Sequence, residues 1–502
     1  MNLNQFRLSR ATSGIPLYQQ LERMVIEAVE AGKLSPSDRM PSVRELAAHL
    51  GVNAVTVSKA YRELARQGIV GGRGRGGTIV LARPSPAAAP VTANELPDVP
   101  AAALVSGNRA FQYMLRAAHG AGVISLTKAY ASPEAVMSDD LRGTLLEFAA
   151  ARIGPEMFEY TGAEGSDELR RILAAYFTVQ GITCNETEVV VTNGAQQALD
   201  IVARASLSPG DTLLMERPTY FGMLDFARSL RVNTVGVAME PDGISIEDLA
   251  QALQRTKSRA LYVMPNFQNP SGVTMSLAKR NAVLELCGQH GVLLIEDDYA
   301  PELRFRGKPL PSLYALARGT TAQPLVCHVR SFNKSLLPGV RLGALIAPGA
   351  LREGFVAARG LSDLHTSNLV QAFATEFFLR CDPATVVKRL SQYYAARQSA
   401  FFEALRAHMP HEVVLARPDG GLNVWLRLPR GLEAGALFYS AMANRVSYLA
   451  GDLFYTDQPD HSTLRLSFGS GSAEELVEGA LRLGSTVKEQ LSRIGGRVSM
   501  VV

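Results

Sequence analysis

Residues 324–343 read PLVCHVRSFNKSLLPGVRLG, an apolar run followed by a lysine that stands between two anion-binding side chains. Lys334 has Ser331 three residues before it and Arg341 seven residues after it. A lysine amine can bind an aldehyde as a Schiff base, and a hydroxyl with a guanidinium can hold a phosphate dianion beside it. Serine and arginine are also common near surface lysines, so this interpretation depends on the segments around it.

Upstream of this lysine, two predicted strands end in residues suited to bind a cofactor. The run VVVTNGAQQALD predicts a strand, a glycine turn and a helix whose first N–H groups, at Ala195 and Gln196, point at an anion. ERPTY places Tyr220 just after a strand, where its ring could stack on a cofactor. Both features fit an aromatic phosphate ester.

Two further strand ends carry amide, acidic and phenolic groups. Asn269 lies in the Pro/Gly turn of NFQNPSG, where it could donate to a ring hydroxyl. LLIEDDY ends a buried strand with Asp297, Asp298 and Tyr299. A carboxylate there can pair with a protonated pyridine nitrogen and keep the ring an electron sink. The pattern leaves open whether Asp297 or Asp298 is this carboxylate.

From about residue 120 to 490, apolar β-type runs alternate with longer amphipathic stretches. The runs are EVVVT, TLLMERP, RALYVMP, GVLLIEDD, PLVCHVRSF and RLGALIAP. Such alternation predicts βαβ units and a mainly parallel sheet. Open α/β sheets bind ligands beyond the carboxyl ends of their strands, which is where the residues above are predicted to lie.

The order of these elements resembles the fold type I pyridoxal 5′-phosphate (PLP) enzymes, specifically the class I and II aminotransferases. The resemblance implies an α/β domain with a mainly parallel sheet, a small C-terminal α/β subdomain and PLP as the cofactor. It implies Lys334 as the aldimine lysine, Asp297 as the pyridine-nitrogen partner and Arg465, in TLRLSFG, as the grip on a substrate carboxylate. The other cofactor residues that it implies are Asn269 and Tyr299 for the 3′-oxygen, Tyr220 for stacking, and Ala195, Gln196, Ser331, Arg341 and a neighbouring subunit's Tyr160 for the phosphate.

Two segments depart from that family pattern. Residues 125–145 lack the Gly-Pro-Asp and Phe-Pro…Trp pattern that is common at the start of these domains, which affects the substrate-side wall. Asn333 stands where SFSK is commoner, a small change beside the lysine.

The first 82 residues show three short helical patterns. One helix ends around Gly32, and Ser42 with Glu45 predicts a capping box at the start of the second. Gly51 ends the second helix, and Asn53 can cap a third. The third helix has an apolar face made of Val57, Ala60, Tyr61 and Leu64. Two helices joined by a short glycine-containing turn predict a helix-turn-helix whose second helix enters the major groove.

After the third helix, IVGGRGRGGTIV predicts a hairpin with two arginines at its tip. The module resembles the winged helix of the GntR family through PLYQQL, RMPSVRELA, GVNAVTVSKAYREL and GGRGRGGTIV. Where family recognition helices often begin with Arg, this chain has Ala54 and then Val55, which favours apolar contact with a thymine methyl. The resemblance implies DNA contacts by Arg44, Thr56, Lys59, Arg73 and Arg75.

Charge is spread unevenly along the 502 residues. Residues 1–83 hold 12 Lys and Arg against 6 Asp and Glu, a net charge of +6, whereas the whole chain carries only +4. Such asymmetry suggests a nucleic-acid or membrane arm. Because RPSPAAAPVTANELPDVPAAALV predicts an extended linker, we expect a winged helix-turn-helix domain at 14–82, a linker at 83–105 and an aminotransferase-like domain at 106–495.

Composition excludes several classes of protein. With 47% hydrophobic and 20% charged residues, the chain can bury large cores and is not disordered. The start has no apolar h-region and no apolar run approaches the ~18 residues of a membrane span, so we expect a cytoplasmic protein without a membrane partner. The four cysteines form no CxxC, and no histidines stand at metal-ligand spacing, so no metal is expected.

A GntR-like winged helix joined to an aminotransferase-like domain is the architecture of the MocR subfamily of transcription regulators. The resemblance implies a homodimer that binds promoter DNA and senses a small amino compound, or PLP itself, at Lys334. An alternative is a working aminotransferase with an accessory DNA-binding module, because the PLP residues and Arg465 look intact. A metabolic enzyme whose N-terminal module binds a protein would leave the +6 charge and the RGRGG tip unexplained.

Overall fold

The computed structural model of the chain describes residues 16–66, 69–72, 77–81, 113–114, 116–118, 120, 122–130, 132–136, 138–151, 153–334 and 339–498. The chain divides into two compact units between Pro100 and Ala101. This boundary falls inside the predicted linker, which lies outside the described residues. Among the described residues, none of the helices combines the length and the apolar character needed to cross a bilayer.

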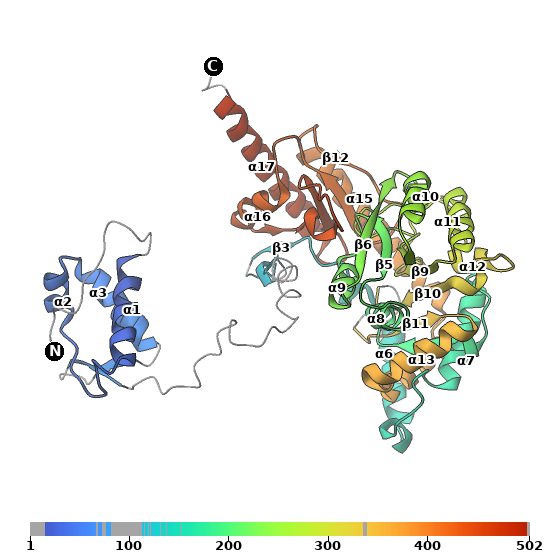
Figure 1. The fold of residues 1–502 in the computed structure, drawn as a ribbon, viewed down its shortest axis with the longest axis horizontal. Coiled ribbons are helices and arrows are strands. Elements are labelled where there is room, and N and C mark those ends of the chain that lie inside the picture. Colours follow the sequence, from blue (N-terminus) through green and yellow to red (C-terminus); the bar gives the residue numbers. More distant parts are fainter. Residues whose placement is uncertain are drawn as a thin grey trace. The chain divides into compact units, whose positions relative to one another are not determined.

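The first unit is a three-helix module with a hairpin. It contains α1 (Leu17–Glu30), α2 (Val43–Leu50), α3 (Ala54–Arg66), β1 (Val70–Gly72) and β2 (Thr78–Val80), and the two strands pair antiparallel (Figure 1). The predicted capping box of α2 is confirmed, since the Glu45 N–H donates to Ser42 Oγ and the Ser42 N–H donates to the Glu45 carboxylate. The four residues predicted for the apolar face of α3 are all buried.

An eight-stranded sheet forms the centre of the second unit, in the order β4-β11-β10-β9-β8-β5-β6-β7. Its strands are β4 (Val189–Thr192), β5 (Thr212–Arg217), β6 (Asn233–Glu240), β7 (Gly243–Ile244), β8 (Ser258–Val263), β9 (Leu293–Asp298), β10 (Val326–Ser331) and β11 (Gly343–Ile346). β11 runs antiparallel to both neighbours and β7 antiparallel to β6, whereas β5, β6, β8, β9 and β10 pair in parallel. The predicted mainly parallel sheet is therefore confirmed.

Every apolar run named from the sequence forms a strand of this sheet, but β6 and β7 were not predicted. β6 mixes small and polar residues, as in Asn233, Thr234 and Gly236, and near the edge of the sheet it is buried only at Gly236 and Val237. A strand without a clean apolar run or a clean alternation has no strong signal in a single sequence.

Helices cover both faces of the central sheet (Figure 1). One face carries α8 (Ala195–Ser206), α9 (Phe221–Ser229) and α13 (Gly349–Asp363). The other face carries α10 (Ile246–Arg255), α11 (Leu277–His290) and α12 (Leu313–Ala317). Because both faces are buried, the strands read as continuous apolar runs.

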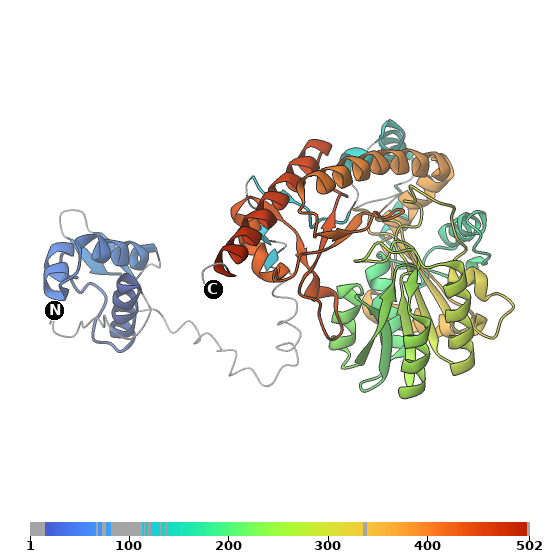
Figure 2. The ribbon, with the colours of Figure 1, turned by 90° about the horizontal axis from the view of Figure 1, so that it is seen from above.

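A smaller α/β region follows toward the C-terminus, as expected. Its antiparallel sheet has the order β12 (Val414–Leu415), β13 (Asn423–Arg427), β16 (Thr463–Ser467) and β15 (Leu449–Ala450). Figure 2 shows α15 (Pro383–His408) and α17 (Ala473–Val498) side by side, and α16 (Ala434–Ala443) completes the region.

The remaining elements join these layers. β3 (Ile124–Ser125) pairs with β14 (Val446–Ser447), so a segment close to the start of the second unit is anchored to the C-terminal region. The others are α5 (Pro133–Val136), α6 (Asp139–Ala151), α7 (Asp167–Val179), α14 (Asn368–Arg380) and the 3-10 turns η3 (Pro155–Phe158), η4 (Glu186–Glu188), η5 (Gln323–Leu325) and η6 (Gly451–Phe454).

Candidate functional site

A cavity of about 380 Å³ lies beyond the carboxyl ends of β5, β8, β9 and β10. With one exception, every residue that the sequence predicted for cofactor or carboxylate binding lines this cavity. These residues are Ala195, Gln196, Tyr220, Asn269, Asp297, Tyr299, Ser331, Lys334, Arg341 and Arg465. The exception is Tyr160. Within the described part of the chain, no group of three or more His, Cys, Asp or Glu could hold a metal ion.

One end of the cavity is built as an anion cradle. Gly194 precedes α8 with φ +90°, and no side chain caps the first turn of that helix. A Cβ on Gly194 would stand 2.6 Å from Asn333 Nδ2 and 3.3 Å from Arg341 Nη2, so only glycine allows these groups to close around the helix start. Free N–H groups, the helix dipole and a guanidinium together suit a phosphate.

Lys334 follows Ser331 at the end of β10 and is partly buried against the cavity. Burial and the nearby cations Arg465 and Arg341 lower the pKa of its amine to about 8, while Asp297 acts in the opposite direction. An amine with such a pKa is mostly unprotonated above about pH 8, well below the range of an ordinary lysine, and the free amine is the form that attacks an aldehyde.

Of the two neighbouring aspartates, only Asp297 lines the cavity. Its Oδ2 accepts a 2.7 Å hydrogen bond from the hydroxyl of Tyr262 on β8, and its Oδ1 is buried without a partner. Burial raises the pKa of Asp297 to about 7, and the hydrogen bond from Tyr262 opposes this shift. An orphaned buried carboxylate oxygen is costly unless a donor meets it, as a protonated ring nitrogen would.

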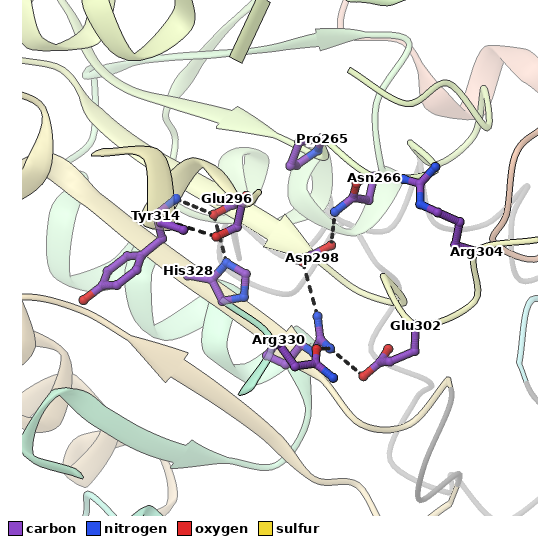
Figure 3. A network of polar contacts seen from close by, with 12 residues as sticks. Pro265, Asn266, Glu296, Asp298, Glu302, Arg304, Tyr314, His328 and Arg330 are labelled. Atoms are coloured by element: carbon purple, nitrogen blue, oxygen red, sulfur yellow. Dashed lines mark hydrogen bonds and ion pairs between the residues drawn. The ribbon is translucent and has the colours of Figure 1, made fainter. Parts of the chain in front are cut away.

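Asp298 points to the opposite face of the sheet, where it belongs to a buried network of charges (Figure 3). Its carboxylate accepts from Asn266 Nδ2 at 2.9 Å and from Arg330 Nη1 at 3.2 Å. Arg330 also donates to Glu302 at 2.5 Å. Burial alone would lower the pKa of the Arg330 guanidinium, but the acidic groups around it outweigh burial and raise that pKa. Asp298 is therefore engaged in ion pairing away from the cavity.

The side chains of Tyr220, Tyr299 and Asn269 already have protein partners. The hydroxyl of Tyr220 donates to Gln196 Oε1 at 2.6 Å, and that of Tyr299 donates to the carbonyl of Phe267 at 2.8 Å. Asn269 accepts from Arg465 through Oδ1, which leaves its N–H donors for another acceptor.

Arg465 comes from a different sheet, on strand β16 of the C-terminal region. Its Nη1 donates to Asn269 Oδ1 at 3.0 Å, its Nη2 donates to the carbonyl of Thr127 at 2.8 Å, and its buried Nε has no partner. Burial lowers the pKa of this guanidinium to about 10. Since no carboxylate neutralises it within the described residues, an incoming carboxylate would be strongly attracted.

Several residues that line the cavity were not identified from the sequence. The polar ones and their neighbours are Thr127, Lys128, Ala129 and Tyr130 from the segment after β3, and Asn423 from β13; Leu199, Phe221 and Met264 add apolar surface. In the sequence, Asn423 could have been noticed as a polar residue between apolar ones in GGLNVW. Residues 127–130 belong to a stretch that departs from the family pattern, and this departure was their only sign.

Tyr160 lies outside the cavity and is 82% exposed. Its ring meets that of His365 edge-on, with 5.6 Å between the centroids. It does not contribute to the cavity of its own chain.

The DNA-contact candidates of the first unit are described in part. Arg44 is exposed, Thr56 is half-buried, and Lys59 is exposed with its Nζ 3.9 Å from the centroid of the Tyr18 ring. Val55 is 66% exposed at the start of α3, as apolar contact with a base would require. Arg73 and Arg75 lie outside the described residues.

One further exposed arginine stands next to the hairpin and was not predicted. Arg39 forms a bridge with Ile79, and its Nε would lie 3.5 Å from a Cβ on Gly77. Its place in RMPSVRELA was visible in the sequence, but its closeness to the hairpin was not.

The site therefore fits PLP on its own chemistry: a lysine amine of lowered pKa, an orphaned carboxylate oxygen and an anion cradle open into one cavity. The family model for class I and II aminotransferases matches residues 124–483. The model for bacterial regulatory proteins of the gntR family matches residues 17–80.

Relatives resemble both units. The chain is 31% identical over 480 residues to the HTH-type transcriptional regulator YdcR of Escherichia coli (strain K12), covering 94% of this chain and 99% of that protein. It is 28% identical over 473 residues to the probable rhizopine catabolism regulatory protein MocR of Rhizobium meliloti, covering 94% of each chain. The crystal structure of LysN, the α-aminoadipate aminotransferase of Thermus thermophilus complexed with N-(5′-phosphopyridoxyl)-L-leucine, matches with a TM-score of 0.71 and 31% identity, over 76% of this chain and 95% of that one.

Fold, site and relatives define a class of PLP-dependent proteins that carry a winged helix ahead of an aminotransferase fold. The chain belongs to the class I and II aminotransferase family and, within that class of fusions, to the MocR subfamily of GntR-type transcription regulators. PLP is the cofactor of its second unit.

The lowered pKa of Lys334 predicts a pH profile that can be measured without cofactor. The rate at which acetic anhydride acetylates Lys334 is measured by mass spectrometry of the peptide that contains it. This rate should increase with a midpoint near pH 8, because the reactive free amine forms above that pKa. The acetylation rate of a free lysine peptide in the same tube should have its midpoint near pH ~10.4, the ordinary pKa of a lysine amine. Arg465→Met removes a nearby cation, so the Lys334 pKa and the midpoint should move upward; an unchanged midpoint would show that Arg465 does not depress this pKa.

Proposed function

We propose that the chain is a homodimeric transcription regulator whose second unit binds PLP and responds to a small amino compound. The observation that carries this proposal is the single cavity lined by Lys334, Asp297 and Arg465, in a chain that also carries a winged helix. The proposed ligand would change the DNA binding of the first unit. Such a switch requires that the ligand bind two states of the protein with different affinity.

Each cavity residue has a proposed task. Bound PLP supplies an aldehyde that reacts with amines and a ring that withdraws electrons. Lys334 would attach to it through the Nζ atom. Asp297 Oδ1 would accept a hydrogen bond from the protonated ring nitrogen, Tyr220 would face the ring, and Asn269 with Tyr299 would bind the 3′-oxygen. The phosphate would be held by Ser331, Arg341 and the N–H groups of Ala195 and Gln196.

Arg465 would bind the carboxylate of the amino compound. Its present partners are neutral acceptors, Asn269 Oδ1 and the Thr127 carbonyl, and its Nε is unpaired. A carboxylate would supply the missing charge and two strong acceptors. Binding would therefore change the contacts of Arg465 with the segment that follows β3.

The first unit is proposed to bind promoter DNA with α3 in the major groove, so we place the protein in the cytoplasm with its operator. Arg44, Thr56 and Lys59 would contact DNA from the helices, and Arg73 and Arg75 from the hairpin tip. The exposed Arg39 beside the hairpin supports a continuous basic surface.

An active aminotransferase is the second candidate. It is favoured by the gathering of the predicted PLP groups and Arg465 in one cavity, and by the likeness to LysN. The two candidates share the site and differ in whether product is released.

A ligand panel separates the two candidates. PLP-loaded protein would be mixed with amino acids and amines while the absorbance of the bound cofactor and the keto acid are measured. We expect a spectral change without sustained keto acid; continuous keto acid would establish the aminotransferase. Lys334→Ala should lose the visible absorbance of lysine-bound cofactor, and an unchanged spectrum would overturn the assignment of this lysine.

Arg44→Ala in the full-length protein should weaken binding to the protein's own promoter region in an electrophoretic or anisotropy titration. If Arg44 contacts a phosphate, the slope of log K against log salt should fall by about 0.9. Arg493→Ala, which removes an exposed arginine of α17, serves as the matched control. Equal affinity of the Arg44 and Arg493 variants would argue against a DNA contact by Arg44.

The dimer proposal rests on an exposed apolar surface around Tyr160. Phe158, Leu361 and Leu364 are 82%, 91% and 57% exposed. The segment that carries Tyr160 lies beside the end of α13, which carries the leucines, since the Tyr160 ring contacts that of His365, the residue after Leu364. An exposed apolar patch of this kind marks an interface, and Tyr160 would reach the phosphate of the partner's site.

A mixing experiment tests that geometry. Tyr160→Ala and Lys334→Ala should each bind PLP poorly or without the lysine-bound absorbance. Mixed and allowed to exchange subunits, they should recover absorbance, because one site in each heterodimer combines an intact Lys334 with the partner subunit's Tyr160. Light scattering should show a dimer, and a dimer without recovery would show that Tyr160 does not serve the partner's site.

A further inference from the structure

The segment that follows β3 forms one wall of the cavity with residues 127–130. It reads TKAY, in the stretch where the sequence lacks the glycine-containing pattern usual for such domains. A lysine, Lys128, thus stands on the wall of a site that already contains other cations.

The backbone of this wall is held firmly beside Arg465. Ser467 N donates to the Leu126 carbonyl at 2.8 Å, and Ser467 Oγ donates to the Lys128 carbonyl at 2.9 Å. Arg465 Nη2 donates to the carbonyl of Thr127, the residue bonded to Lys128. Since strand β16 carries both Ser467 and Arg465, it fixes the position of Lys128 relative to the carboxylate-binding guanidinium.

The charges around the cavity do not balance. The charged residues that line it are four cations, Lys128, Lys334, Arg341 and Arg465, and one carboxylate, Asp297. The dianionic phosphate of PLP would be held by Arg341 together with Ser331 and the start of α8, its ring nitrogen would pair with Asp297, and its aldehyde would take up the Lys334 amine. A monocarboxylic amino compound then neutralises Arg465 and leaves Lys128 unmatched.

No group of the protein in the described part of the chain neutralises Lys128. Among these residues, no ion pair or side-chain hydrogen bond engages its ammonium group, although the residue is half-buried. Glu475 lines a neighbouring cavity of about 180 Å³ together with Lys128, but its carboxylate accepts from the Ser472 N–H at 2.8 Å as part of the start of α17. A half-buried cation without a partner is a place for an anion from outside.

We infer that the cavity selects an amino compound with two anionic groups, one held by Arg465 and the second by Lys128. The chemical class is that of acidic amino acids, in which a side-chain carboxylate accompanies the α-carboxylate. This inference rests on the proposed function, because it names the ligand class of the same site.

The test compares acidic amino acids with their neutral side-chain amides, which have nearly the same shape. PLP-loaded wild-type protein is titrated with L-glutamate against L-glutamine and with L-aspartate against L-asparagine, and the cofactor absorbance is followed. In at least one pair the acidic member should reach half-saturation at a concentration about tenfold lower or less, as expected for a charge-assisted hydrogen bond. Lys128→Met keeps the length of the side chain and should bring the two members of that pair close together.

The matched control is Lys257→Met, which removes an exposed lysine between α10 and β8 that does not line the cavity. This control variant should keep the wild-type preference for the acidic member over the amide. Equal half-saturation for both members of each pair in the wild type, or an unchanged preference in Lys128→Met, would overturn the inference while leaving the proposed function intact. A loss of PLP affinity in Lys128→Met would also overturn it, by making Lys128 a cofactor residue. If no amino compound changes the absorbance at all, the proposed function itself fails.

Discussion

Side chains on β9 alternate between two faces of the sheet that are both buried, so its consecutive carboxylates need partners on opposite sides. On one face, Glu296 is paired with His328 at 2.9 Å and Asp298 with Arg330 at 3.2 Å. On the other face, Asp297 has Tyr262 for one oxygen and nothing for the second. The paired carboxylates hold the strand end in place, and the unpaired oxygen of Asp297 leaves this end of the sheet with a buried acceptor that a protonated ring nitrogen would satisfy.

The site is completed by groups from parts of the chain that are far apart. Lys334 and Asp297 belong to the parallel sheet, whereas Arg465 reaches the same cavity from the C-terminal sheet and binds the carbonyl of Thr127. A ligand held by both Lys334 and Arg465 would therefore touch both regions, together with the segment that leads back along the chain toward the DNA-binding unit. Because the ligand would contact both regions, its contacts would differ between two states in which these regions are arranged differently. Any ligand-driven switch requires such a difference.

How well a residue could be predicted depended on how local its surroundings are. Asp297, Ser331 and Lys334 stand at the ends of apolar runs, and a strand end in an open α/β sheet has a known location. Lys128 and Asn423 enter the cavity only through long-range packing, so their sequence neighbours carry little sign of it. The choice between Asp297 and Asp298 was equally hidden, since both faces of β9 are apolar and period-two patterning has no polar side to read.

The sequence by itself determined the two-part organisation, the winged helix, the mainly parallel sheet and the strand ends whose residues the structure gathers in one cavity. These follow from local patterns: apolar periodicity, capping residues, glycine turns and the spacing around Lys334. Only the tertiary structure decided which aspartate faces the cavity, which neutral groups hold Arg465 and that Lys128 shares its wall. The physical reason is that hydrogen bonding and charge balance depend on distances between residues far apart in the chain, and folding alone brings those residues together.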